Sequence, residues 1–188
     1  MKYKKLSCFW GEYAEVAMTV NGHCKWGLIH KSGAEVIPTK YDSISYVGGD
    51  VVFVNIGFKE GRKLQYPGKW GIVDLKNIVI VPFKYSVLYP YENGFASVCI
   101  RNKWGVIDWH GSIMIPIKYD FICQTPVEKL YMIELASKFG LISIDGKVVV
   151  EPIYDELNCW NQSDPDQYFA VRKNDETFFI DKYGKQKF

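Results

Sequence analysis

Long apolar runs, an excess of one charge and paired cysteines are all missing from this chain of 188 residues. No stretch of about 18 apolar residues occurs, so we expect no membrane-spanning helix. The lysine-rich start is not followed by the apolar core of a signal peptide. With 23 basic and 21 acidic residues, the formal net charge is +2, which predicts neither a nucleic-acid partner nor attraction to a membrane surface. We therefore expect a cytoplasmic protein.

The cysteines number five, an odd count without the spacing of a disulfide framework. In a cytoplasmic protein such residues are usually reduced and often behave as small apolar side chains. We expect reduced, mostly buried thiols at Cys8, Cys24, Cys99, Cys123 and Cys159.

Sequence motifs for catalysis, cofactors and metals are missing too. The chain has no C-x-x-C or H-x-x-x-H pair for zinc, no Walker or G-x-G-x-x-G loop for nucleotides and no G-x-S-x-G nucleophile. Among three histidines, His23 beside Cys24 is the best nucleophile pair, and a buried thiol next to a turn histidine explains it more simply. We predict no enzyme activity, no cofactor and no metal.

What the chain does contain is one segment in four copies and a partial fifth. The first copy, KWGLIHKSGAEVIPTKYDSI, begins at Lys25, and the others begin at Lys69, Lys103 and Lys138, with the partial copy from Thr177 to the end. In each full copy a tyrosine lies fifteen residues after the lead aromatic residue, so we expect identical structural units. We assign a structural role to the motif residues Trp26, Gly27, Trp70, Gly71, Trp104, Gly105, Phe139, Gly140, Tyr41, Tyr85, Tyr119 and Tyr154.

The Lys-Trp-Gly triplet, the later proline and the Tyr-Asp pair resemble the WG-repeat family of bacterial proteins. The resemblance extends from about Met18 to Asp181, although Phe139 and Thr177 depart from tryptophan. It implies a repeat architecture, and it implies no particular function because the family is not tied to one activity.

Each unit predicts three antiparallel strands. In the third unit, FASVCI and KWGVID form a hairpin around Arg101-Asn102, and SIMIPI follows as the third strand. Between the second and third strands, aspartate at the first position and glycine at the fourth, as in Asp108 to Gly111, is typical of a type I turn. The repeated aspartate is therefore a turn residue and not a catalytic carboxylate. The proline of the third strand belongs at a strand end, an edge or a bulge.

The glycine after each lead aromatic residue marks a bulge or a close approach by another group. We expect an aromatic ring from a neighbouring unit over it, which would make the tryptophans a stacked spine between repeats. The alternative is that each indole fills the core of its own unit. In both cases Trp26, Trp70 and Trp104 are structural residues first.

The segment 125–140 carries conflicting signals. Thr125 to Glu128 resembles a helix capping box with proline at the first helical position, and Gly140 could close a helix. The repeat register instead makes YMIELA a strand. We side with the register, because tertiary context overrides local propensity, and leave open a single helical turn.

The predicted fold is all-β, with about five antiparallel units of three or four strands. We favour a propeller-like closed ring over an open β-solenoid, because closure removes exposed sheet edges. The chain is then one domain, and residues 1–13 could complete the last unit. The units extend roughly over 14–46, 51–90, 94–124, 130–158 and 167–188.

Binding residues are expected where the repeat is interrupted. The insertion at 55–67 combines cations and aromatic residues, a composition suited to protein contact, and its alternative is a long hairpin loop without a partner. We predict a scaffold for another protein, of which a bacterial immunity-type protein is one version, and a carbohydrate or small-ligand module is the alternative. The candidate binding residues are Phe58, Arg62, Lys63, Tyr66 and Trp160.

Overall fold

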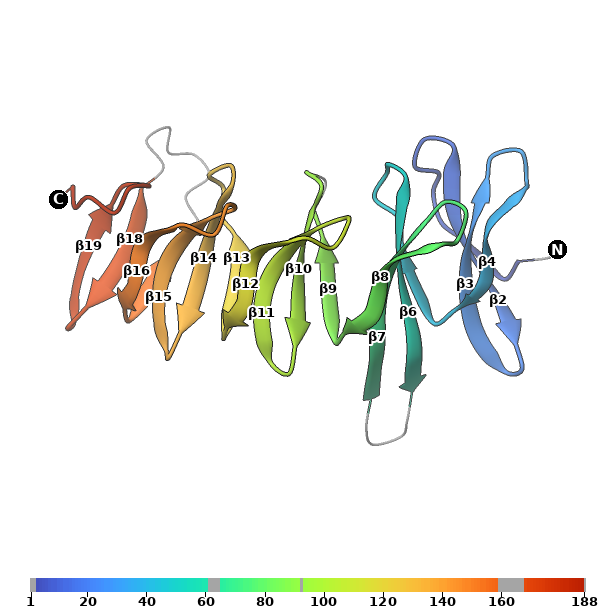
Figure 1. The fold of residues 1–188 in the computed structure, drawn as a ribbon, viewed down its shortest axis with the longest axis horizontal. Coiled ribbons are helices and arrows are strands. Elements are labelled where there is room, and N and C mark those ends of the chain that lie inside the picture. The colour runs from blue at the N-terminus through green and yellow to red at the C-terminus, as the bar shows by residue number, and fades with distance from the viewer. Residues whose placement is uncertain (1–2, 61–64, 92, 159–167, 188) are drawn as a thin grey trace. The chain divides into compact units, whose positions relative to one another are not determined.

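The computed structural model describes residues 3–60, 65–91, 93–158 and 168–187, and this part of the chain consists of strands and turns without a helix (Figure 1). The strands form five antiparallel sheets in chain order, four with four strands and one with three. The predicted all-β fold with about five small units is confirmed. The chain divides into two compact parts, Met1–Ile100 with Ile107–Ser112, and Arg101–Val106 with Ile113–Phe188.

The first two sheets lie in the first part. The first sheet contains β1 (Lys5–Leu6), β2 (Tyr13–Val20), β3 (His23–His30) and β4 (Glu35–Tyr41). The second sheet contains β5 (Ser43–Ser45), β6 (Val51–Glu60), β7 (Gln65–Asp74) and β8 (Val79–Tyr85). In both sheets the strand order follows the chain order.

The remaining sheets repeat this order. The third contains β9 (Val87–Pro90), β10 (Phe95–Ile100), β11 (Lys103–Asp108) and β12 (Ile113–Tyr119). The fourth contains β13 (Phe121–Gln124), β14 (Leu130–Leu135), β15 (Lys138–Ser143) and β16 (Val148–Tyr154). The fifth contains β17 (Glu156–Asn158), β18 (Phe169–Lys173) and β19 (Glu176–Ile180).

Each later sheet takes its first strand from the segment directly after a motif tyrosine. The segment Ser43–Ser45 follows Tyr41 and pairs with β6, and Phe121–Gln124 follows Tyr119 and pairs with β14. The predicted units assigned such residues to the preceding copy, whereas their hydrogen bonds assign them to the following sheet. One residue between two strands therefore joins each sheet to the next.

The N-terminal segment provides this strand for the first sheet. Lys5 and Leu6 pair with Ala17 and Val16 of β2. Whether residues 1–13 also complete the last unit stays a prediction. Near the C-terminus, Gln186 pairs with Ile180 of β19, so it lies where a fourth strand of the fifth sheet would begin. The closed ring stays a prediction.

Two kinds of turn recur as predicted. The hairpin turn at Arg101-Asn102 has φ values of 50° and 61°, the left-handed pair of a type I′ turn. In the second kind, the Gly111 N–H donates to the Asp108 carbonyl at 3.0 Å, and Gly111 has a φ of 94°. Asp108 Oδ1 accepts the N–H groups of His110 at 3.0 Å and Ser112 at 2.8 Å. This confirms the aspartate as a turn residue.

The glycine after each lead aromatic residue lies in a bulge against its own sheet. Trp26 pairs with Tyr41 and Leu28 with Ile37, so residues 38–40 of β4 lie opposite the single Gly27. A Cβ on Gly27 would lie 2.4 Å from the Ile37 carbonyl oxygen. The predicted bulge is confirmed, and the predicted ring from a neighbouring unit is wrong, because the backbone of the third strand already occupies that space.

The same contact recurs in the other full units. A Cβ on the glycine would meet the carbonyl oxygen of the residue ten positions later, at distances of 2.7, 2.6 and 2.4 Å. The motif proline lies in this bulged outer strand, which confirms its predicted place. The glycine–carbonyl pairs are Gly71 with Val81, Gly105 with Ile115, and Gly140 with Val150.

Two further expectations concern the segment 125–140 and the cysteines. Leu130–Leu135 is the strand β14, as the repeat register predicted, and the buried Thr125 closes a turn by donating to the Leu130 carbonyl at 2.9 Å. The described cysteines are free thiols. Cys8 and Cys24 are exposed, Cys99 is buried and Cys123 is intermediate. The expectation of mostly buried thiols is therefore wrong, while Cys159 lies outside the described residues.

Replacing Gly27 with alanine should lower the free energy of unfolding by about 2 kcal/mol or more, since the added methyl group overlaps the Ile37 carbonyl oxygen. Urea denaturation measures this loss. Gly22→Asn is the control, because Gly22 has open space around it and asparagine tolerates its φ of 80°. Equal stability of Gly27→Ala and the wild type would contradict the bulge contact.

Candidate functional site

The motif aromatic residues lie in equivalent surroundings within their sheets. Trp26 and Trp70 each pair across two strands with the tyrosine fifteen residues later. The hydroxyl of Tyr41 continues this chain of contacts by donating to Asn77 Oδ1 of the second sheet at 2.6 Å. The ring of Tyr41 also stacks on Phe83 with a centroid separation of 6.2 Å. These residues therefore stabilise the sheets and the contact between them. Functional residues are expected instead at positions that differ between units.

The aspartate after the motif tyrosine forms a second fastening. Lys25 Nζ pairs with Asp42 Oδ1, and Asp42 Oδ2 accepts the backbone N–H of Gly57 at 2.8 Å. The Asp42 N–H also donates to the Asn55 carbonyl at 2.9 Å. One carboxylate thus joins a lysine of one sheet to the hairpin of the next.

This lysine–aspartate pair recurs with a constant separation of seventeen residues. Lys103 pairs with Asp120, whose other oxygen accepts the Ala136 N–H at 3.0 Å. Lys138 pairs with Asp155, whose other oxygen accepts the Asn174 N–H at 3.2 Å. The sequence shows both the Tyr-Asp pair and its spacing from the lysine, but our interpretation had given that aspartate no partner.

The second unit lacks this carboxylate. Seventeen residues after Lys69 comes Ser86. The backbone hydrogen bond that Asp42 makes in the first unit is kept, because the Ser86 N–H donates to the Cys99 carbonyl at 2.9 Å. The Ser86 hydroxyl donates to the same oxygen at 3.0 Å. Within the described part of the chain, Lys69 forms no ion pair.

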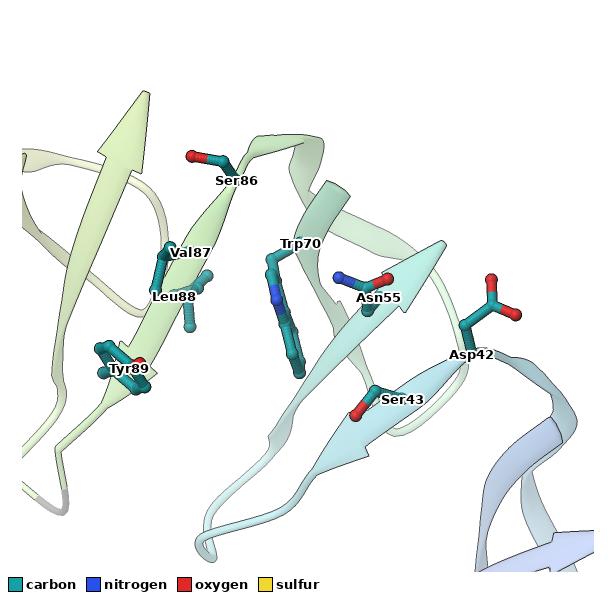
Figure 2. A pocket seen from close by; sticks show the side chains of 8 residues that line it. All are labelled: Asp42, Ser43, Asn55, Trp70, Ser86, Val87, Leu88 and Tyr89. Carbon is teal, nitrogen blue, oxygen red and sulfur yellow. The ribbon is translucent and has the colours of Figure 1, made fainter. Parts of the chain in front are cut away.

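A pocket of about 370 Å³ lies beside this position (Figure 2). Trp70 stands in its middle, with Asp42, Ser43 and Asn55 on one side and with Ser86 and the β9 side chains on the other. The volume is within the range of small-molecule sites, which combine apolar walls with a few polar groups. The lining residues are Asp42, Ser43, Asn55, Trp70, Ser86, Val87, Leu88 and Tyr89.

The strand register explains the polar side of this pocket. Ser43 pairs with Asn55, and Asn55 pairs with Trp70, so the three side chains form a row across β5, β6 and β7. In the first sheet the matching row contains Lys5, and its ammonium group lies 5.6 Å from the ring centroid of Trp26. The second sheet has the shorter Ser43 at the Lys5 position.

The side chains of the predicted binding residues are not among those that the structure describes. Phe58 and Tyr66 belong to β6 and β7, where their backbones continue the hairpin, and their side chains are not among those described. Arg62, Lys63 and Trp160 lie outside the described residues. None of these predictions is therefore tested.

Trp70 and Trp109 are the aromatic residues whose roles sequence reasoning missed. The sequence pattern assigns Trp70 a structural role and Trp109 a turn position. The Trp109 indole N–H donates to the Phe95 carbonyl at 3.0 Å, and its ring meets Phe53 edge to face at 5.7 Å. A repeat comparison could have singled out Trp109, because the matching turn positions hold Lys31, Leu75 and Ile144.

The described residues contain neither a metal-binding cluster nor a membrane-spanning helix. No three His, Cys, Asp or Glu side chains of that part gather where they could hold a metal ion. In the same residues, no helix has the length and apolarity needed to cross a membrane.

Five small antiparallel sheets, four of which share the contact between the motif glycine and a carbonyl oxygen, define a β-repeat protein. The family model of the WG containing repeat matches residues 26–57, 70–104, 104–138 and 139–176, well over half of the chain. The chain therefore belongs to the WG repeat family, as its sequence indicated. Comparison with curated proteins gave no match.

Replacing both Asp120 and Asp155 with asparagine should destabilise the protein at neutral pH and have little effect in strong acid. The hydrogen bonds from Lys103 and Lys138, followed by those from the Ala136 and Asn174 N–H groups, hold the pKa of these carboxyls below the usual 3.8. Their stabilisation is therefore present above pH 3.8 and is lost as the pH falls through the lower folded-state pKa.

Chemical denaturation across this pH range measures the effect. The matched control neutralises Glu128 and Asp175, two highly exposed carboxylates, by Glu128→Gln and Asp175→Asn. A loss of stability that is the same at every pH would show that the lysine pairs do not contribute through charge.

Proposed function

We propose that this WG-repeat protein is a non-catalytic binding scaffold whose partner is another protein in the cytoplasm. The repeated residues support the proposal because they serve the fold: the aromatic residues pair within sheets and the aspartates join them. Positions at which one unit departs from the others are then free to determine what is bound.

The hairpin β6–β7 is the observation that carries the proposal. Both strands have ten residues and pair from Val51–Asp74 to Glu60–Gln65, whereas β10 and β11 have six residues each. The neighbouring strand β5 pairs only with residues 53–55, and β8 only with residues 70–73. The far half of the hairpin thus presents backbone edges to which a strand of a partner protein can add.

Shortening this hairpin should abolish partner binding while the fold remains. Replacing residues 57–68 with Asn-Gly joins the paired residues Ile56 and Lys69 through a type I′ turn and keeps a backbone N–H at position 57 for Asp42. Affinity capture from extracts of the native cells should recover a stoichiometric protein with the wild-type chain and not with the shortened one.

The control carries Asn-Gly in place of Arg101-Asn102, which changes a turn of the same type without shortening a hairpin. Circular dichroism and thermal unfolding establish that all three chains are folded. Recovery of the same protein by the shortened chain, or of no stoichiometric protein by the wild type, would contradict the proposal.

A second candidate function is the binding of a small ligand or carbohydrate, and the Trp70 pocket favours it. An indole offers a broad apolar wall, while Ser43 and Asn55 lie beside it and can hydrogen-bond to ring hydroxyl groups. Asn55 is buried, with 1% of its surface exposed, so its amide is held in place by the sheet.

Trp70→Leu should weaken the binding of a monosaccharide roughly tenfold, because it removes the aromatic wall and keeps an apolar side chain. Trp26→Leu is the matched control, since it removes the equivalent indole where Lys5 already covers the ring. NMR titration with glucose measures both variants. Equal binding by Trp70→Leu and Trp26→Leu would eliminate the pocket as the site.

A further inference from the structure

We propose that two copies of this chain associate head to tail, with the outer edge of β19 in one copy against residues 3–6 of the other. The contact would continue the joint between consecutive sheets, which is formed by a motif tyrosine and the residue after it. The inference goes beyond the proposed function, because the partner is a second copy of the chain and the β6–β7 hairpin takes no part.

Residues 3–6 have the backbone arrangement of the joint that precedes each later sheet. The Lys4 N–H donates to the Ala17 carbonyl at 2.8 Å. In the joint before the second sheet, the Asp42 N–H donates to the Asn55 carbonyl at 2.9 Å. Tyr3, directly before Lys4, therefore stands at the position of a motif tyrosine. The first sheet thus begins with the same joint as the later sheets.

The side of the first sheet that would face a preceding sheet is open. Tyr3 is partly exposed, whereas the motif tyrosines of the full units are at most 7% exposed. A Cβ on Gly33 would meet no atom within 4 Å. At the matching turns, a Cβ on Gly111 or Gly146 would lie within 3.1 Å of the preceding sheet's outer strand, β8 or β12. The first sheet therefore has room for a neighbour of the kind that the later sheets have.

The fifth sheet exposes the complementary face. Two residues after the lead aromatic residue, the full units place an apolar side chain with 0% of its surface exposed, namely Leu28, Ile72, Val106 and Leu141. These side chains belong to cores shared with the following sheet, as the first and fourth sheets show. The same position in the fifth unit holds Phe179, which is 41% exposed. The outer face of the fifth sheet is therefore apolar and accessible.

The outer edge of β19 is open beside this face. Among the described residues, only the segment from Gln186 onward bonds to that edge, at residues 179–180. Residues 176–178 have no described strand beside them on this side. At the same place in the full units, the motif tyrosine pairs with the lead aromatic residue. Tyr3 of a second copy can take that position opposite Thr177.

The fifth unit can accept such a segment without a bulge. Phe178 replaces the motif glycine, and its ring meets Tyr154 of the preceding sheet edge to face at 5.9 Å. In the second unit, Phe83 of the bulge makes this kind of contact by stacking on Tyr41. Because Phe178 already fills the space, a short extended segment such as residues 3–6 is sufficient.

The charges of the two surfaces are opposite in sign. Inside the chain, the lysine before the lead residue pairs with the aspartate after the motif tyrosine. In the fifth unit the lysine position holds Glu176, and in the first joint the aspartate position holds Lys4. Both side chains are exposed, and neither forms an ion pair with another described residue. A pair between Glu176 and Lys4 of two copies would reproduce the internal joint with its charges exchanged, which favours a second copy over an unrelated strand.

Sedimentation velocity with the full chain, from micromolar to millimolar concentration, tests the inference. The wild type should form dimers and longer species as its concentration rises, because a head-to-tail contact leaves one surface unoccupied at each end. Lys4→Glu and Glu176→Lys should each weaken self-association about tenfold or more, since each places like charges opposite one another. An equimolar mixture of the two variants should associate like the wild type, because every contact between the two kinds of chain again pairs opposite charges.

Lys76→Glu and Glu128→Lys are the matched controls, because they make the same changes of charge at exposed positions of other sheets. Each should associate like the wild type, and circular dichroism establishes that all variants are folded. A wild type that stays monomeric up to millimolar concentration would overturn the inference. Self-association that neither Lys4→Glu nor Glu176→Lys weakens, or that their mixture does not restore, would overturn it too. The hairpin experiment tests the separate protein partner.

Discussion

Each full unit depends on the contact between the motif glycine and a carbonyl oxygen of the outer strand, which is β4, β8, β12 or β16. Three residues of the outer strand lie opposite one glycine, for example residues 38–40 opposite Gly27. A side chain there would overlap the backbone. The bulge brings Tyr41 opposite Trp26 and turns the chain out of the sheet directly afterwards. The aspartate that follows can then meet both a lysine of its own sheet and the hairpin of the next.

Because of this constraint, the residues that recur in every unit say little about function. Tryptophan, glycine, proline, tyrosine and aspartate each take part in the bulge or in the joint that it produces. Their recurrence reflects the same fastening made several times, in keeping with a family that is not tied to one activity. Positions outside the bulge and outside the contact between sheets differ between units, and Ser43 and Asn55 are such positions beside the Trp70 indole.

Patterns within one unit made the strands, the turns and the bulge predictable from sequence. Alternating apolar residues and the Asp-x-x-Gly turns act locally, so β10, β11 and the Asp108 turn could be located from the residues alone. Contacts between strands far apart in sequence could not. The row from Ser43 through Asn55 to Trp70 depends on the register of three strands, and the partner of Gly27 depends on a bulge in β4.

The repeats also provide an internal comparison that a single-copy fold cannot offer. Where Lys5 covers Trp26 and Asp42 pairs with Lys25, the chain itself occupies the space around the indole and the ammonium group. Where serine replaces both kinds of side chain, around Trp70, the same backbone leaves a pocket. Ser43 and Ser86 stand at the positions that Lys5 and Asp42 hold around the first indole, so the side chains around Trp70 differ from those around Trp26.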